Sequence, residues 1–185
     1  MCLTIREHKS SSYGPRTYQN ASEGDVTIAL AVDYSTAGER LTHKAAGEKY
    51  LKLNMNALDN LQLARLLYKR LASLGKALPT INVAGNGIYT LDKHGITQAY
   101  INQCVYDILA KVNEHWPIGK IVSGGQTGVD LAGGVAGKAL GIETVMTLPK
   151  GFIMRHEDKL DVEHTAEQIV GMVDKWVNLL EMESK

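Results

Sequence analysis

Short apolar runs alternate along this chain with longer stretches in which apolar residues recur at helical spacing. The runs consist largely of β-branched and aliphatic residues, as is typical of buried strands; they lie at Val26–Val32, Tyr50–Leu53, Thr80–Ala84, Lys120–Val122 and Ile142–Leu148. The helical spacing predicts amphipathic helices; they are expected over Leu58–Leu74, from Thr97 to Val112, over Val129–Leu140 and over Thr165–Met182. From Thr80 onwards, strands and helices therefore alternate.

This alternation predicts the fold class. A strand, a helix and a second strand form a parallel pair with a right-handed crossover. Repeated units of this kind place helices on both faces of the sheet. The sequence therefore predicts an α/β protein with a Rossmann-like parallel sheet sandwiched by helices.

The same pattern divides the chain into three parts. Residues 1–24 are polar and are expected to form a loose N-terminal arm. Residues 25–75 hold a strand, a polar loop and a helix that ends at Gly75, a natural helix stop. We expect this extension to pack on the core. Residues 76–185 are expected to form the Rossmann-like domain itself.

Composition indicates an ordinary globular protein. Of the 185 residues, 44% are hydrophobic and 22% are charged, which suffices for a core. Lysine and arginine number 20, as do aspartate and glutamate, so the formal net charge is zero. The composition therefore gives no reason to expect nucleic acid as a partner. No stretch approaches the roughly 18 apolar residues of a spanning helix, and we expect no membrane attachment.

The two cysteines, Cys2 and Cys104, lie far apart, and no Cys/His spacing resembles a metal site. We therefore expect neither a disulfide framework nor a bound metal. The N-terminus lacks the apolar core of a secretory signal. Unpaired thiols are typical of reducing compartments, so a cytoplasmic location is predicted.

The strongest chemical signal is the segment Ser123–Asp130, SGGQTGVD, between a predicted strand and a predicted helix. The first N–H groups of a helix lack internal partners and its N-terminus is electropositive, so an anion is stabilised there. Gly124, Gly125 and Gly128 are expected to remove three Cβ atoms where a phosphate would lie. The hydroxyl and amide side chains between them offer donors.

Two further glycine-bearing turns follow predicted strands: AGNG at 84–87 and PKGF at 149–152. In an open parallel sheet, ligands bind outside the carboxyl ends of the strands. We therefore expect the three turns to outline one crevice, large enough for a nucleotide rather than for a lone phosphate.

These residues resemble a known family. SGGQTGVDLAG, followed by LGI and LPKGF, resembles the YpsA-like, molybdenum-carrier branch of the SLOG superfamily, and INVAGNGIYTL resembles the first strand and turn of that family. The resemblance covers Thr80–Asp161. It implies a Rossmann-like domain related to DNA-processing protein A and to the cytokinin-activating LOG enzymes. It also implies a nucleotide or nucleotide-derived ligand, with no further cofactor identified.

Carried over by position, the ligand-binding residues implied by the resemblance come from the three turns and the segment after them. They are Gly85, Asn86 and Gly87; Ser123, Gly124, Gly125, Gln126, Thr127, Gly128 and Asp130; Pro149, Lys150 and Gly151; and Arg155.

One departure from the family changes the functional expectation. The LOG enzymes have a PGGxGTxxE motif whose Glu serves in catalysis, and no Glu stands at that place in SGGQTGVDLAG. The leading hypothesis is therefore a protein that senses, carries or sequesters the ligand. A hydrolase cleaving an N-glycosidic or phosphate bond is the alternative, with Asp130, Glu39 or Asp33 as the carboxylate. A carrier of a molybdenum cofactor or oxyanion is a third reading.

Residues outside the family core raise two further expectations. The polar segment DYSTAGERLTHKAAGEK contains Arg40 and Lys44, which are candidate phosphate ligands in a lid. Its other interpretation is a solvated loop and helix face. We also expect a homo-oligomer, a dimer or larger, with Trp176 on the last helix as a candidate contact.

Overall fold

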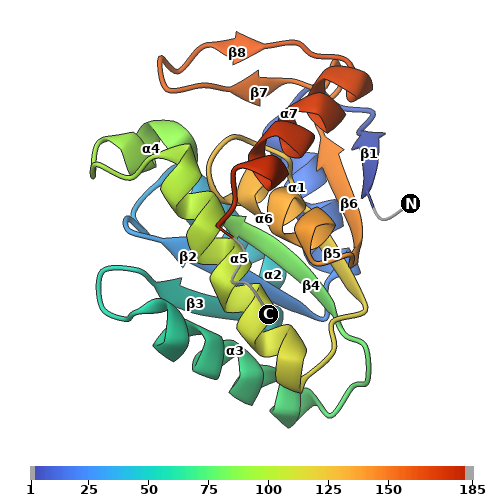
Figure 1. Ribbon diagram of the computed structural model, residues 1–185. Coiled ribbons are helices and arrows are strands. Elements are labelled where there is room, and N and C mark those ends of the chain that lie inside the picture. Colours follow the sequence, from blue (N-terminus) through green and yellow to red (C-terminus); the bar gives the residue numbers. More distant parts are fainter. Residues whose placement is uncertain (1–2, 182–185) are drawn as a thin grey trace.

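The computed structural model describes residues 3–181 and contains a six-stranded sheet in which all paired strands run parallel (Figure 1). In sheet order the strands are β1 (Leu3–Glu7), β6 (Glu143–Leu148), β5 (Lys120–Ser123), β4 (Thr80–Gly85), β2 (Val26–Ala31) and β3 (Tyr50–Asn54). All six residues of β2 are buried, as expected of a strand that is covered on both faces. The predicted α/β, Rossmann-like fold is confirmed.

Helices cover both faces of this sheet (Figure 1). One face is covered by α1 (Tyr13–Glu23) and α2 (Ala37–Ala46), which pack against each other; the 3₁₀ turn η1 (Gly47–Lys49) follows α2. The other face is covered by α3 (Asn60–Leu74), α5 (Gln98–His115), α6 (Val129–Ala139) and α7 (Ala166–Asn178). The short helix α4 (Ile88–Asp92) precedes α5, and a small antiparallel hairpin joins β7 (Met154–Arg155) to β8 (Asp161–Val162).

Local signals place most of these elements where the sequence predicts them. Thr97 and Thr165 accept hydrogen bonds from the backbone N–H groups of their first helical turns, and Gly75 ends α3 in the left-handed conformation. The N-cap of α3 is Asp59, which forms a capping box with Gln62; the helix starts two residues later than expected. Cys2 and Met182 lie outside the described residues.

The first 24 residues are not a loose arm, and that prediction is wrong. Leu3 pairs with Thr144 at the start of a full parallel ladder between β1 and β6. The helix α1 then buries Arg16, Asn20 and Ala21. Neither element is visible as apolar periodicity, because β1 is a half-exposed edge strand and the buried face of α1 is mostly polar.

The polar segment after β2 is also more ordered than a loop. Thr36 caps α2 by accepting a hydrogen bond from the N–H of Glu39. The buried residues of α2 are Glu39, Thr42 and Ala46. Two of the three are polar, so this helix too lacks the apolar stripe by which helices are recognised.

A single sheet contains strands from both sides of residue 76, where the sequence predicted a boundary between two parts of the chain. β2 pairs with β4, so residues 25–75 join the core by strand pairing as well as by packing. The connection after β2 leads to one face of the sheet and the connection after β4 leads to the other. Neighbouring strands whose connections diverge in this way leave a crevice beyond their carboxyl ends, where α/β proteins bind ligands.

Candidate functional site

A cavity of about 360 Å³ lies at this crevice and extends beneath α1 and α2. Its walls are the turns that follow β2, β4 and β5, the inner faces of α1 and α2, and the end of β4. Ligand pockets in proteins occupy about 300–1,000 Å³, so this cavity is suited to a mononucleotide-sized molecule. The turns after β4 and β5 thus share one crevice, with the turn after β2 as the third.

The three glycines of SGGQTG serve different purposes. A Cβ at Gly124 would overlap the Arg16 guanidinium and the Asp130 carboxylate, so this glycine admits those side chains into the cavity wall. A Cβ at Gly125 would meet the side chain of Leu148, and one at Gly128 would meet the backbone of the AGNG turn. Both residues also have positive φ angles, 70° and 94°. Of the three glycines only Gly124 lines the cavity, so Gly125 and Gly128 are not placed to clear a phosphate position within it.

The AGNG turn lines the cavity, and its residues also hold the crevice in shape. A Cβ at Gly85 would overlap the carbonyl oxygen of Leu30 on the neighbouring strand. The Asn86 side chain accepts from the N–H groups of Val32 and Asp33 (2.9 and 3.0 Å) and donates to the carbonyl of Asp33. Gly87 stands at the opening with nearest atoms at ordinary contact distance.

The PKGF turn lies away from the cavity. The N–H of Lys150 donates to the carbonyl of Ser10 at 2.9 Å, and the N–H of Gly151 donates to the carboxylate of Glu7 at 2.7 Å. The segment between β1 and α1 therefore occupies this turn. Pro149, Lys150 and Gly151 do not line the cavity, and neither does Ser123, which is fully buried beneath the loop.

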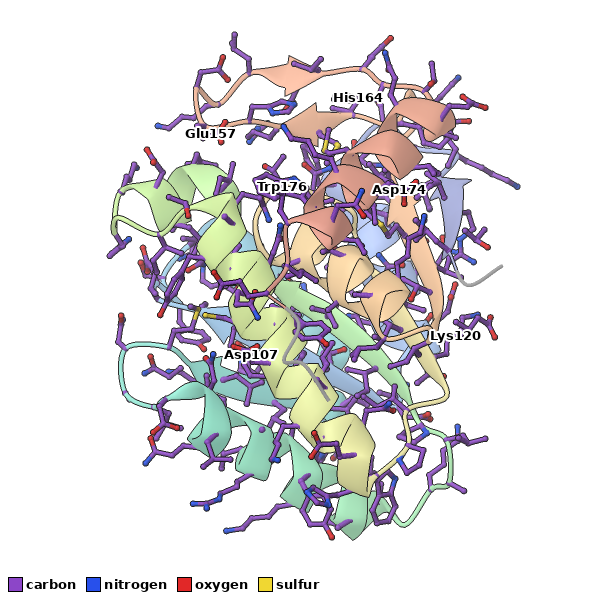
Figure 2. All side chains as sticks on the ribbon, in the orientation of Figure 1. Asp107, Lys120, Glu157, His164, Asp174 and Trp176 are labelled. Carbon is purple, nitrogen blue, oxygen red and sulfur yellow. The ribbon has the colours of Figure 1, made fainter. Side chains whose placement is uncertain are left out.

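Gln126 and Thr127 form hydrogen bonds that hold the β7–β8 hairpin beside the cavity opening. The Gln126 amide donates to the carbonyl of Ile153 (2.7 Å) and accepts from the N–H of Arg155 (3.0 Å), while the Thr127 hydroxyl donates to the carbonyl of Arg155. Arg155 lines the opening. Figure 2 labels Glu157 and His164 on this segment, which lies beyond the carboxyl end of the sheet.

The Arg155 side chain has partners within the protein. Its guanidinium binds the Asp161 carboxylate through two nitrogens, at 2.8 and 2.9 Å, and lies 5.2 Å from the centre of the Tyr13 ring. Tyr13 donates to Asp161. Burial, followed by the nearby Asp161, raises the pKa of Tyr13 to about 12. Arg155 is therefore held at the opening as a positioned cation.

Inside the cavity, Arg16 from α1 pairs with Asp130 from α6 at 3.2 Å. Both side chains are buried. Burial raises the pKa of Asp130, whereas the Arg16 guanidinium and the backbone N–H of Gln126 act to lower it. The Asp130 carboxylate therefore lies in the first turn of α6, so the electropositive N-terminus of this helix already has an anionic group of the protein beside it. Asp130 was predicted from the sequence as a site residue, and Arg16 was not.

Glu39 from α2 lines the same cavity and is 2% exposed. Burial, followed by repulsion from the Asp130 carboxylate, raises its pKa to about 7. Tyr50 donates a hydrogen bond to this carboxyl group, which limits the rise, while Oε2 has no hydrogen-bond partner among the described residues. Of the three carboxylates considered from the sequence, Glu39 and Asp130 line the cavity and Asp33 does not.

The deep end of the cavity contains further polar groups that sequence reasoning missed. Asn20, Thr42 and Asn82 all line it and are buried. The Asn82 amide donates to Thr27 at 3.1 Å, whereas neither the oxygen nor the nitrogen of the Asn20 amide has a partner in the part of the chain that the structure describes. The available signal was the spacing of Arg16 and Asn20, one helical turn apart in a segment without apolar periodicity.

The expected lid residues lie outside the cavity. Arg40 and Lys44 are exposed on α2, and the Arg40 guanidinium donates to the carbonyl of Ser35. The start of the same helix, Thr36–Gly38, does line the cavity. A Cβ at Gly38 would meet nothing within 4 Å, so this helix N-terminus is open to an incoming group.

Trp176, the residue considered for self-association, is labelled on α7 in Figure 2. It is partly buried and packs on the smaller hydrophobic cluster, which includes Leu131 and Met146. Self-association stays a prediction.

Among residues 3–181, no group of three or more His, Cys, Asp or Glu side chains is arranged to hold a metal ion. None of the helices described is both long and apolar enough to cross a membrane. Comparison with known proteins adds no identity: no family model, curated protein or solved structure matches the chain.

Proposed function

We propose that this protein binds a nucleotide or nucleotide-derived small molecule in the cavity between the sheet and the helices α1 and α2. The supporting observation is that the turns after β2, β4 and β5 converge on one cavity at the point where the connections diverge. Membership of the SLOG superfamily, with the YpsA-like branch as the nearest resemblance, is part of this proposal and rests on the SGGQTGVD and AGNG segments.

The charges in the cavity orient the proposed ligand. Glu39 and Asp130 lie inside and repel a phosphate, whereas the open start of α2 and Arg155 lie at the opening. A phosphate is stabilised at a helix N-terminus with small residues, as at Ala37 and Gly38. The phosphate therefore belongs at the opening, with the uncharged part of the ligand pointing inward.

Binding is tested by isothermal titration calorimetry and thermal unfolding against nucleoside monophosphates, cyclic nucleotides, ADP-ribose and molybdate. We expect at least one nucleotide to bind and to stabilise the fold by about 2.7 kcal/mol at 100 times its Kd. Molybdate is expected to bind weakly, because the cavity holds two carboxylates and both of its arginines are paired with carboxylates of the protein. Failure of every nucleotide to bind would contradict the proposal.

Gly38 offers a direct test of the phosphate position. A Cβ at Gly38 has open space around it, so Gly38→Glu adds a carboxylate at the opening and Gly38→Gln adds a neutral side chain of the same size there. We expect the Glu variant to bind nucleoside monophosphates at least tenfold more weakly than the Gln variant, while both fold normally. Equal affinities in the two variants would place the phosphate elsewhere.

Hydrolysis of an N-glycosidic or phosphate bond is a second candidate function, favoured by the two carboxyl groups in one cavity. A carboxyl with a pKa near 7 suits a general acid, and a second carboxylate held by an arginine suits a base. Chromatography of nucleoside monophosphates and NAD after prolonged incubation tests it. Product formation that is abolished by Glu39→Gln is expected; unchanged substrates would leave binding as the function.

A further inference from the structure

The deepest part of the cavity contains buried polar groups that the protein leaves without partners. Asn20 is 2% exposed, and neither Oδ1 nor Nδ2 of its amide has a hydrogen-bond partner among residues 3–181. Glu39 Oε2 and Arg16 Nε, which belong to residues lining the same cavity, are also unpartnered. Such groups are uncommon in folded proteins because each one costs free energy. Their concentration in one cavity points to a ligand that supplies the partners.

The geometry of an amide defines what can pair with it. The Asn20 side chain presents an acceptor and a donor side by side in one plane. Its complement is a planar edge with a donor beside an acceptor, which is how asparagine reads the amino group and ring nitrogen of adenine. A single hydroxyl group cannot meet both amide atoms with the same geometry.

The position of Glu39 limits which hydrogen-bond donor the ligand can present to Asn20. An amino group has two N–H bonds, so one can meet Asn20 while the other meets the free oxygen of Glu39. A ring N–H has only one. Arg16 is paired with Asp130, whose carboxylate acts on Glu39 by repulsion. The remaining titratable groups that influence Glu39 are Asp33 and Tyr50.

We propose that the end of the cavity beneath α1 and α2 is a nucleobase subsite that selects an amino group beside a ring nitrogen, held by Asn20 with Glu39 alongside. This inference rests on the proposed function and adds the part of the ligand that confers specificity. Adenine and cytosine have such an edge. The residues responsible come from helices outside the segment that resembles a known family.

Calorimetry with four probes tests the subsite: AMP, CMP, purine riboside 5′-monophosphate, which lacks the amino group, and ribose 5-phosphate. We expect AMP or CMP to bind at least tenfold more tightly than the last two. Ribose 5-phosphate that binds as tightly as both AMP and CMP would overturn the subsite and leave the proposed function standing. Failure of all four probes to bind would overturn both.

Asn20→Leu separates recognition from folding. Leucine has a similar shape and removes two unpaired buried polar atoms, so the melting temperature of the ligand-free protein should stay the same or rise. The preference for the amino-bearing probe should fall to less than twofold. Gln19→Leu, at the preceding position of α1 and away from the cavity, should keep the full preference.

Two results with Asn20→Leu would contradict the assignment. One is an unchanged preference for the amino-bearing probe. The other is a lower melting temperature together with equal loss of affinity for ribose 5-phosphate, which would identify Asn20 as a structural residue. Glu39→Gln provides a second variant: it keeps the size of the side chain and should weaken AMP or CMP while leaving ribose 5-phosphate within twofold.

Discussion

The glycine turns and the α1–α2 pair form opposite walls of one cavity, and their residues differ in kind. Most glycines of the turns are there because a Cβ would strike backbone or core, as at Gly85 and Gly128. The helices instead bury charged and amide side chains, several without partners, where a core would place apolar ones. The turns therefore build the shape of the crevice, and the helices provide its chemistry.

The largest loss of stability is expected when a side chain is added at a glycine of the turns. Gly85→Ala puts a methyl group onto the carbonyl oxygen of Leu30, and no flexible side chain is there to give way. We expect the free energy of unfolding to fall by roughly 4 kcal/mol or more, measured by urea denaturation. Gly171→Ala, in α7 with open space around it, should instead raise it by about 0.5–1 kcal/mol. A tolerated Gly85→Ala would show that the turns are not a rigid scaffold.

Removing the positive charge of Arg16 on α1 should have the next largest effect on the free energy of unfolding. Arg16→Met leaves the Asp130 carboxylate buried without its ion-pair partner. The expected loss of unfolding free energy is about 3 kcal/mol. Adding Asp130→Asn removes the unpaired charge and should recover part of that loss. If the double variant is as unstable as Arg16→Met, packing of the long Arg16 side chain matters more than the ion pair.

Glu39 makes the stability depend on pH. Because its pKa rises from 4.5 in the unfolded chain to about 7, the folded protein binds this proton more tightly. The stabilisation is complete below pH 4.5, declines as the pH rises, and is lost above pH 7. Relative to Glu39→Gln, the wild type should lose about 2–3 kcal/mol between pH 4.5 and pH 8 in urea denaturation. Parallel curves for the two proteins would show that folding leaves the pKa of Glu39 unchanged.

The smallest effect is expected at the opening. Asp161→Asn weakens an ion pair whose two side chains are about 40% exposed, so the free energy of unfolding should change by less than about 1 kcal/mol. The released Arg155 can then turn to a phosphate, and the affinity for nucleoside monophosphates should rise up to a few fold. A loss of several kcal/mol would mean that the hairpin is part of the stable scaffold.

The same contrast explains what the sequence could predict. Strands such as β2 and helices such as α5 bury apolar residues, so their pattern identifies them, and Gly75 marks a helix end by its backbone requirement. α1 escaped because Arg16 and Asn20 occupy its buried face. Apolar periodicity indicates only the burial of apolar groups. A helix that buries polar residues therefore has no apolar periodicity by which it could be predicted.

Of the candidate site, the sequence predicted the half that is built from turns. Gly85, Gly87, Gly124 and Asp130 do line the cavity, as the glycine pattern suggested. Pro149–Gly151 do not, because the chain before α1 fills that place. That outcome depends on the pairing of β1 with β6, a contact between distant segments that no local pattern encodes.

The pairing of the first strand with the last strand of the sheet also sets when the cavity can exist. Arg6 contacts a residue 141 positions away and Arg16 contacts one 114 positions away. A chain emerging from the ribosome cannot pair β1 with β6, or Arg16 with Asp130, until α6 and β6 have been made, and such long-range contacts slow folding. The chemistry of the cavity is therefore assembled among the last steps of folding, so that ligand binding would report that nearly the whole chain is in place.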